Sequence, residues 1–342
     1  MASNPSERTI CARLMNDRFA LCLPREEFDE KRVADSIKEL QREFSGNSFH
    51  LHTYMGVYEI RDRDEAVSIM VDKANIAADT IKNNYDCCVA YYDEHLLEIS
   101  IEQRRLLGEF EPALQNDEFV MYLQPQVKRD GAAKGAEALV RWVHPSRGIL
   151  TPYAFIDILE NAGLIYKLDL YIWEKAAQKL AEWKEKGYGS YHISVNISTK
   201  DFYIIDIYET FTGLINKYGI AASNLHLEIT ETTLMTDFEK NMNIIHKLQG
   251  VGFRVEIDDF GSGYSSLNML KDISADVLKI DMGFLRKSEN EVKGQDILES
   301  IITLAGKIGM DVITEGVETK KQLDMLTMMG CHEFQGYYFS KP

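Results

Sequence analysis

Two adjacent carboxylates, Asp258 and Asp259, end an alternating apolar run and precede a Gly-Ser-Gly turn in the segment VEIDDFGSGYSSL, residues 255–267. Like charges on neighbouring residues repel each other, so this pair favours a position beside bound cations. Placed side by side, the two aspartates could each hold one metal ion or share one, and the ions would relieve the repulsion. The segment therefore predicts metal chemistry at the end of a strand.

Other polar residues occupy equivalent positions in strand-like segments. Successive side chains of a strand point to opposite faces, so each segment divides into an apolar face and a polar face. In LHLEIT (225–230) the leucines and the isoleucine share one face, and Glu228 lies on the other. If the apolar faces meet outer helices, the polar faces point into a barrel. The residues that this alternation places on inward faces are Glu137, Arg141, Asn196, Glu228, Asp258, Lys279, Glu315 and Gln335.

A cluster of buried carboxylates needs cations. One polar residue at a strand end is ordinary, but several carboxylates buried together cost several kcal/mol each unless their charge is neutralised. The candidate ligands offer only oxygen atoms, which suit Mg²⁺ or Mn²⁺ better than Zn²⁺. Two such ions, about 3.5–4 Å apart, are a recurring device for in-line displacement at phosphorus. The candidate metal ligands are Glu137, Asn196, Glu228, Asp258, Asp259 and Glu315.

Two cationic residues fit a site that binds a phosphodiester. Arg141 could bind a phosphate through two parallel hydrogen bonds. Lys279 could orient or help to deprotonate an attacking water, or it could pair structurally with Asp281.

The elements that position these residues follow a regular order. From about residue 119, strand-like segments alternate with helical patterns at a spacing of roughly 30 residues, which predicts a mostly parallel sheet. Eight such segments predict a closed (β/α)₈ barrel, whose chemistry lies at the C-terminal ends of its strands. The segments are 119–127, 135–142, 191–198, 225–230, 253–260, 276–281, 310–316 and 332–339.

Charge and composition limit the class of protein. The 342 residues include 38 Lys and Arg against 54 Asp and Glu, and the net charge of −16 repels nucleic-acid polymers and anionic membranes. A small anionic ligand could still bind where metals or a few cations reverse the field. The sequence has no signal-peptide pattern and no apolar stretch of about 18 residues. Its five cysteines lack a Cys-x-x-Cys spacing. We therefore expect reduced thiols and a cytoplasmic location.

The ordered motifs resemble those of the EAL domain family of bacterial cyclic di-GMP phosphodiesterases. The resemblance covers the chain from about residue 110 and implies a modified TIM barrel whose first strand runs antiparallel to the others. It also implies hydrolysis of cyclic di-GMP to linear pGpG with two Mg²⁺ or Mn²⁺ ions, and a homodimer. We interpret 116–342 as this barrel. The segments that carry the resemblance are EALVRW (137–142), VNIS (195–198), LEITE (227–231), DDFGSGYSSL (258–267), KID (279–281), TEGVET (314–319) and QGYYFSKP (335–342).

Matching the motifs residue by residue implies individual roles. Lys279 matches the lysine that contacts the nucleophilic water, and Arg141 matches the phosphate-binding arginine. Gln124 and Gln335 match positions that bind substrate, the latter near the second metal. Glu231 matches a glutamate that holds the DFGSGYSSL loop in its working shape. The implied metal ligands are Glu137, Asn196, Glu228, Asp258, Asp259 and Glu315, of which Glu137 and Glu315 count with Lys279 as catalytic.

One residue departs from the family pattern. Glu256, where many relatives carry a small residue, adds a carboxylate to the inward face below Asp258. It could pair with Arg254 or with His226, and it could also alter metal affinity.

The favoured reading is an active phosphodiesterase. A different class is a catalytically silent EAL receptor, which binds the same ligand and acts through protein partners. Silent members usually lose a metal ligand or the loop glutamate, and this sequence retains both, so the enzyme is favoured. The alternation of strand faces, taken by itself, also permits a third interpretation. This is another metal-dependent barrel hydrolase that acts on a different phosphodiester.

Residues 1–92 resemble the C-terminal part of a GGDEF domain, the fold of diguanylate cyclases. RLMNDRFALCLP aligns with the signature turn, but Met15 and Asn16 replace its two glycines and Arg18 replaces its acid. Glycines let the backbone approach a nucleotide, and the acid binds metal, so we expect no cyclase activity. We predict a partial, degenerate GGDEF-like module here and a linker helix at 93–115.

Overall fold

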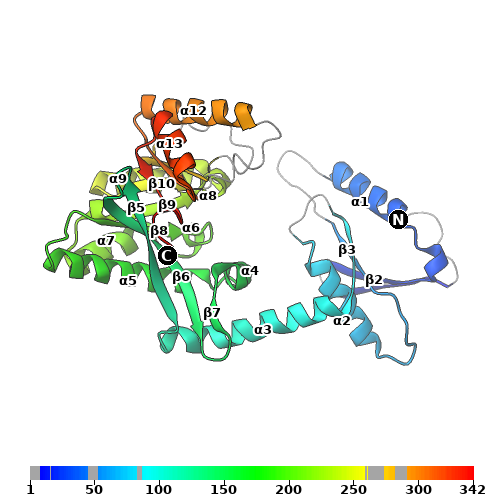
Figure 1. Ribbon diagram of the computed structural model, residues 1–342. Helices are drawn as coiled ribbons and strands as arrows, with labels where there is room; N and C mark the ends of the chain where they lie inside the picture. Colours follow the sequence, from blue (N-terminus) through cyan, green and yellow to red (C-terminus); the bar gives the residue numbers. More distant parts are fainter. Residues whose placement is uncertain are drawn as a thin grey trace. The chain divides into compact units, whose positions relative to one another are not determined.

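The computed structural model describes residues 8–15, 17–44, 53–82, 87–258, 260, 273–281 and 291–342. The chain divides into two compact units, Met1–Leu106 and Leu107–Pro342. The boundary falls within the helix α3 (Glu94–Gln115), which matches the predicted helical segment. Figure 1 labels many of the helices and strands of the two units.

The larger unit is a barrel built on a nine-stranded sheet with the order β5-β13-β12-β11-β10-β9-β8-β6-β7. Pairing of β5 with β6 closes every strand except β7 into a ring. β5 is antiparallel to β6 and β13, whereas all other neighbours in the ring are parallel. This confirms the predicted TIM-like barrel with an antiparallel first strand. The ring consists of β5 (Phe119–Lys128), β6 (Ala133–His144), β8 (His192–Ile197), β9 (Leu225–Thr230), β10 (Arg254–Asp258), β11 (Val277–Asp281), β12 (Asp311–Glu315) and β13 (Glu333–Phe334).

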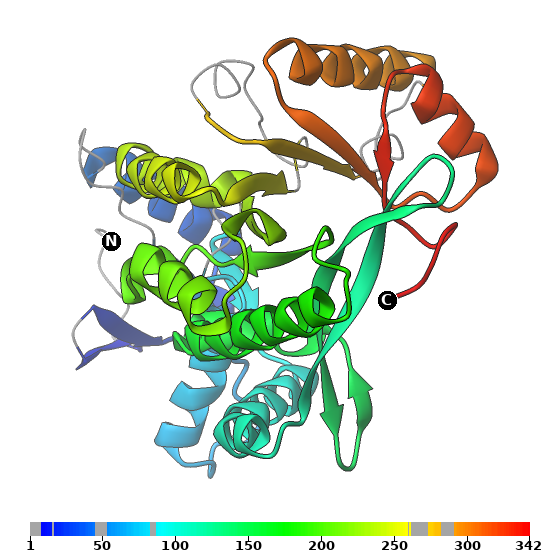
Figure 2. The ribbon, with the colours of Figure 1, turned by 90° about the vertical axis from the view of Figure 1, so that its left-hand side faces the viewer.

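Helices lie outside the strands, as Figure 2 shows. Trp173 is fully buried, and its ring centroid lies 4.5 Å from that of Phe211. Its Nε1 donates a hydrogen bond to the Asn196 carbonyl at 2.9 Å. The helix that carries Trp173, α5 (Ile165–Glu185), therefore also fixes the end of β8. None of the helices in the described residues has the length and apolar character of a membrane span. The α-helices of this unit beyond α3 are α4 (Ile156–Ala162), α5 (Ile165–Glu185), α6 (Asp201–Ile204), α7 (Ile207–Tyr218), α8 (Glu231–Thr236), α9 (Phe238–Val251), α12 (Glu291–Lys307) and α13 (Lys320–Met328).

Two strands differ from the sequence-based boundaries. β6 continues to His144 and pairs with β7 (Gly148–Leu150), a strand that the sequence pattern did not indicate. β13 forms only at Glu333–Phe334, although the predicted segment was 332–339. The chain bends just after it at Gly336, which has φ +155°. The backbone there lies so close to Val317 that a Cβ would come within 2.2 Å of the Val317 carbonyl oxygen, so only glycine fits.

In its described residues, the smaller unit contains two small sheets, two α-helices and one short 3₁₀ helix (Arg25–Glu27) before α3. β1 (Ile10–Met15) and β2 (Arg18–Cys22) form an antiparallel hairpin. The second sheet pairs two parallel strands, and Gly56 within it lies so close to a helix that a Cβ would meet the Ala74 carbonyl oxygen at 1.9 Å. The remaining elements are α1 (Glu30–Phe44), β3 (Met55–Val57), α2 (Val67–Asp79) and β4 (Val89–Tyr91). Strands and helices alternate as expected, and the assignment to a GGDEF-like module stays a prediction.

Candidate functional site

Polar side chains from all the strands of the ring gather at one end of the barrel. The carboxylates of Glu137, Glu228 and Glu315 converge, and one oxygen of each lies within 4.8 Å of the others. Because side chains alternate along each strand, one inward residue per strand is enough to build this cluster. The contributors, in strand order, are Gln124 (β5), Glu137 (β6), Asn196 (β8), Glu228 (β9), Asp258 (β10), Lys279 (β11), Glu315 (β12) and Gln335, which follows β13.

Lys279 lies in the middle of these carboxylates and is only 1% exposed. Its Nζ is 2.6 Å from Glu315 Oε1 and 3.3 Å from Glu137 Oε2. It also contacts Glu228 Oε1 and lies 3.7 Å from Asp258 Oδ1. A lysine therefore occupies the place where the candidate metal ligands meet.

Glu137 links the cluster to the neutral side chains around it. Its Oε2 accepts a hydrogen bond from Gln335 Nε2 at 2.5 Å, and its Oε1 accepts one from Asn196 Nδ2 at 3.4 Å. Gln335 Nε2 also donates to Gln124 Oε1 at 3.1 Å. The amide groups of Asn196 and Gln335 thus bond directly to Glu137, and that of Gln124 is linked to it through Gln335. Together they fix the position of the Glu137 carboxylate.

The electrostatics favour additional positive charge. Burial raises the pKa of Glu315 to about 7, although Lys279 opposes the shift. Burial alone would lower the pKa of Lys279, but Glu137 and Glu315 outweigh it and hold that pKa above its usual value. Glu228 Oε2 is buried and lacks a hydrogen-bond partner among the described residues. One lysine against four carboxylates leaves a surplus of negative charge that a cation could neutralise.

Three predicted site residues lie apart from this cluster or outside the described residues. Arg141 donates from Nη1 to the Val140 carbonyl at 2.8 Å, and its guanidinium lies 5.7 Å from the Tyr122 ring centroid. Glu231 begins α8 directly after β9, and the loop that it is predicted to hold lies largely outside the described residues. Asp259 lies outside them as well, so its predicted metal role stays a prediction.

Comparison with known proteins agrees with this geometry. Residues 108–342 match the family model described as the EAL domain. The chain belongs to the EAL domain family. The solved structure of the PaMucR phosphodiesterase in its c-di-GMP complex superimposes with a TM-score of 0.66 and 33% identity, covering 70% of this chain and 97% of that one.

Curated relatives of this EAL domain are longer proteins. MucR of Pseudomonas aeruginosa, named a bifunctional diguanylate cyclase/cyclic di-GMP phosphodiesterase, is 30% identical over 350 residues, covering 99% of this chain. PdeR of Escherichia coli, named a cyclic di-GMP phosphodiesterase, is 33% identical over 230 residues, covering 67% of this chain. The chain spans 50% of the length of the first and 35% of the second.

The structure decides between the two partners expected for Glu256 in this EAL domain. Glu256 Oε1 lies 2.6 Å from His226 Nδ1. Arg254 instead donates from Nη2 to Asp311 Oδ2 at 2.6 Å. Arg254 lies at the first position of β10, and its long side chain reaches past β11 to Asp311 at the start of β12.

Sequence reasoning did not find two contacts that shape the site of this EAL domain. The first is the bond between Gln335 and Gln124, which are 211 positions apart along the chain. The second is the bond from Trp173 to the backbone beside the site. The only sequence signal for the second was a tryptophan on the apolar face of a long helix, which is also typical of ordinary core packing.

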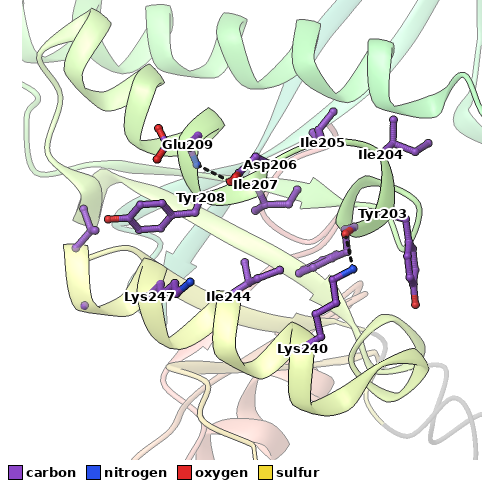
Figure 3. A pocket seen from close by; sticks show the side chains of 13 residues that line it. Tyr203, Ile204, Ile205, Asp206, Ile207, Tyr208, Glu209, Lys240, Ile244 and Lys247 are labelled. Atoms are coloured by element: carbon purple, nitrogen blue, oxygen red, sulfur yellow. Dashed lines mark hydrogen bonds between the residues drawn. The ribbon is translucent and has the colours of Figure 1, made fainter.

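A surface hollow of about 810 Å³ lies elsewhere on the EAL domain, between the α6–α7 segment and α9 (Figure 3). Ile204 and Ile244 line it together with Lys240 and Lys247, and no residue of the carboxylate cluster does. The Lys240 Nζ lies 4.6 Å from the centroid of the Tyr203 ring, which also lines the hollow. The chemistry-bearing groups are at the barrel end, so we place the candidate site there.

Proposed function

We propose that this chain is an active, metal-dependent cyclic di-GMP phosphodiesterase that opens the cyclic dinucleotide to linear pGpG. The observation that carries the proposal is the convergence of Glu137, Glu228 and Glu315 around the buried Lys279. Relatives named cyclic di-GMP phosphodiesterases and a related structure with bound c-di-GMP support the choice of substrate. We further propose that the chain acts in bacterial signal transduction by lowering this messenger.

The residues present suit divalent ions with oxygen ligands. Carboxylates and one amide make up the donor set, and Glu228 Oε2 is a buried oxygen that a cation would satisfy. We propose two Mg²⁺ or Mn²⁺ ions as the cofactors, because paired ions of this kind serve displacement at phosphorus. Such ions would lower the pKa of the attacking water and neutralise charge on the phosphate oxygens. The proposed ligands are Glu137, Asn196, Glu228, Asp258, Asp259 and Glu315.

In the proposed reaction, a water oxygen bonds to phosphorus while one bond from phosphorus to a ribose 3′-oxygen breaks. The 3′-oxygen takes up a proton, the water loses one, and the phosphate stays on the 5′-oxygen, which gives pGpG. The carboxylates keep Lys279 protonated, because they hold its pKa above its usual value. Lys279 is proposed to orient the water by donating a hydrogen bond. Arg141 is proposed to bind a phosphate oxygen, and Gln124 and Gln335 to contact the substrate.

Three further points of organisation are proposals. A homodimer through the barrel and a cytoplasmic location follow from the family and from the composition. Residues 1–92 are proposed as a degenerate GGDEF-like module, with 93–115 as the linker helix and 116–342 as the catalytic barrel. The β1–β2 hairpin lies where the signature turn is expected, and Arg18 at the start of β2 supports the absence of cyclase chemistry.

The test is incubation of the purified chain with cyclic di-GMP and Mg²⁺ or Mn²⁺, followed by chromatographic separation of the products. We expect pGpG to accumulate linearly with time and to disappear from the products when a chelator removes the metal.

The other outcomes point to the other classes. Tight binding of cyclic di-GMP without any pGpG would contradict catalysis and identify a receptor. Absence of both binding and turnover would contradict the substrate assignment and favour a hydrolase of another phosphodiester.

A further inference from the structure

A second cluster of ligand-type side chains lies deeper in the same barrel. It consists of His192, His226 and Glu256, whose possible ligand atoms all lie within 4.8 Å of one another. His226 stands two residues before Glu228 on β9, and Glu256 stands two residues before Asp258 on β10. Because inward residues recur every second position, His226 and Glu256 stand one inward position below Glu228 and Asp258, and His192 stands two inward positions below Asn196 on β8.

This deep cluster is closed to solvent and densely packed. His192, His226 and Glu256 are 5%, 3% and 0% exposed. The two imidazole rings are stacked with centroids 3.8 Å apart and an interplanar angle of 5°. Gly135 on β6 makes room for the first ring, since a Cβ there would lie 2.3 Å from His192 Nε2. Because Gly135 has no side chain, the His192 ring can pack directly against β6.

Polar satisfaction within the deep cluster is incomplete. His192 Nε2 lies 2.7 Å from Gln126 Oε1, and His226 Nδ1 lies 2.6 Å from Glu256 Oε1. The other carboxylate oxygen, Glu256 Oε2, is buried and makes no hydrogen bond of ordinary geometry in the described part of the chain. Burial raises the pKa of Glu256 to about 8, and the Ser194 hydroxyl only partly opposes that rise. A buried carboxylate oxygen without a donor is costly, and a cation would remove that cost.

We propose that His192, His226 and Glu256 bind one divalent ion of the Zn²⁺ class. Two imidazoles and one carboxylate are a donor set for Zn²⁺ and similar borderline ions, whereas Mg²⁺ prefers oxygen donors alone. The side-chain oxygen of Gln126 is available as a fourth ligand, because it already lies beside His192. The site is thus chemically distinct from the carboxylate cluster above it.

Ion binding requires a defined local change. The in-plane lone pairs of parallel rings do not converge, so at least one imidazole must rotate, and the His226–Glu256 hydrogen bond is replaced by bonds to the ion. Burial, and after it the positive charges of Lys134 and Arg254, lower the pKa of both imidazoles. Each of these cations is paired, Lys134 with Glu333 and Arg254 with Asp311, and the pairing weakens its repulsion of an ion. The ion would join β8, β9 and β10, and so stabilise the strands that carry Asn196, Glu228 and Asp258.

The proposal does not rest on the proposed phosphodiesterase function, and its test uses no substrate. The whole chain is stripped of metal and titrated with Co²⁺ in an excess of Mg²⁺, which occupies the oxygen-rich cluster. We expect the intense visible absorption of a four-coordinate Co²⁺ site with nitrogen ligands, at one ion per chain, and its loss when Zn²⁺ is added. Glu256→Gln, which keeps the size of the side chain, should weaken Co²⁺ binding by at least about tenfold.

The matched control is His246→Gln, because His246 is an exposed histidine on α9 and belongs to neither cluster. This variant should bind Co²⁺ as the unmodified chain does. A measurement without any variant is the ¹⁵N spectrum of the imidazoles, in which Zn²⁺ should shift the signals of two of the eight histidines. Absence of the Co²⁺ spectrum, equal Co²⁺ affinity of Glu256→Gln, or unshifted His192 and His226 signals would each overturn the proposal.

Discussion

Replacement of Glu137 by Gln is expected to reduce cyclic di-GMP hydrolysis by roughly a hundred- to a thousandfold or more, the scale seen when one group that stabilises transition-state charge is removed. The carboxylate of Glu137 contacts Lys279, Gln335 and Asn196, so it is both a proposed metal ligand and the group that orders its neighbours. Glutamine keeps the shape of the side chain and removes its charge. The initial rate of pGpG formation and the dissociation constant for Mn²⁺ measure the effect.

The fold should tolerate this change, because Lys279 keeps its contacts with Glu228 and Glu315. The matched control is Glu333→Gln on β13, which removes a carboxylate that pairs with Lys134 and lies outside the proposed site. We expect the control to hydrolyse the substrate at the rate of the unmodified chain. Near-normal turnover and Mn²⁺ affinity in Glu137→Gln would show that the metal assignment is wrong.

Replacement of Lys279 by Met is expected to abolish turnover and to make folding depend on metal. Lys279 is the only lysine side chain that the described residues place among Glu228, Asp258 and Glu315. Removing one member of a buried ion pair typically costs about 3–5 kcal/mol, because the other charge is left uncompensated. The free energy of unfolding in chelator should therefore fall by several kcal/mol, as measured by urea denaturation.

Metal should reverse much of that loss. Mn²⁺ supplies the positive charge that the variant lacks, so the rise in Tm on adding Mn²⁺ should be larger for Lys279→Met than for the unmodified chain. The control is Lys134→Met, whose lysine is partly exposed and pairs with a single glutamate, so its cost should not exceed about 1 kcal/mol. A metal-free Lys279→Met chain as stable as the unmodified one, or one without metal rescue, would contradict this description of the cluster.

The inward-facing set could be predicted because the period of a strand is fixed. Alternation alone placed Glu137, Asn196, Glu228 and Glu315 on polar faces, and the repeated strand–helix spacing predicted the ring that brings them together. The exposure of each inward side chain, which depends on its depth along the barrel axis, could not be predicted in the same way. Asn196 is exposed at its strand end, whereas Glu228, its register partner on the next strand, is 1% exposed.

Contacts between distant segments depend on strand register and on how far each side chain reaches. Neither can be read from the pattern of a single sequence. Glu256 lies on the same face of β10 as Arg254, yet it pairs with His226 on the neighbouring strand, β9. β13 ends after two residues because Gly336 brings the backbone against Val317, and spacing cannot reveal such an approach.

The most direct measurement is anomalous scattering from crystals of the chain grown with Mn²⁺. If inward carboxylates of the barrel hold the catalytic ions, the difference map will contain manganese peaks bounded by Glu137, Glu228 and Glu315, within metal–oxygen bonding distance of their carboxylates. A map with manganese only on the acidic exterior, and none among those three side chains, would contradict the account.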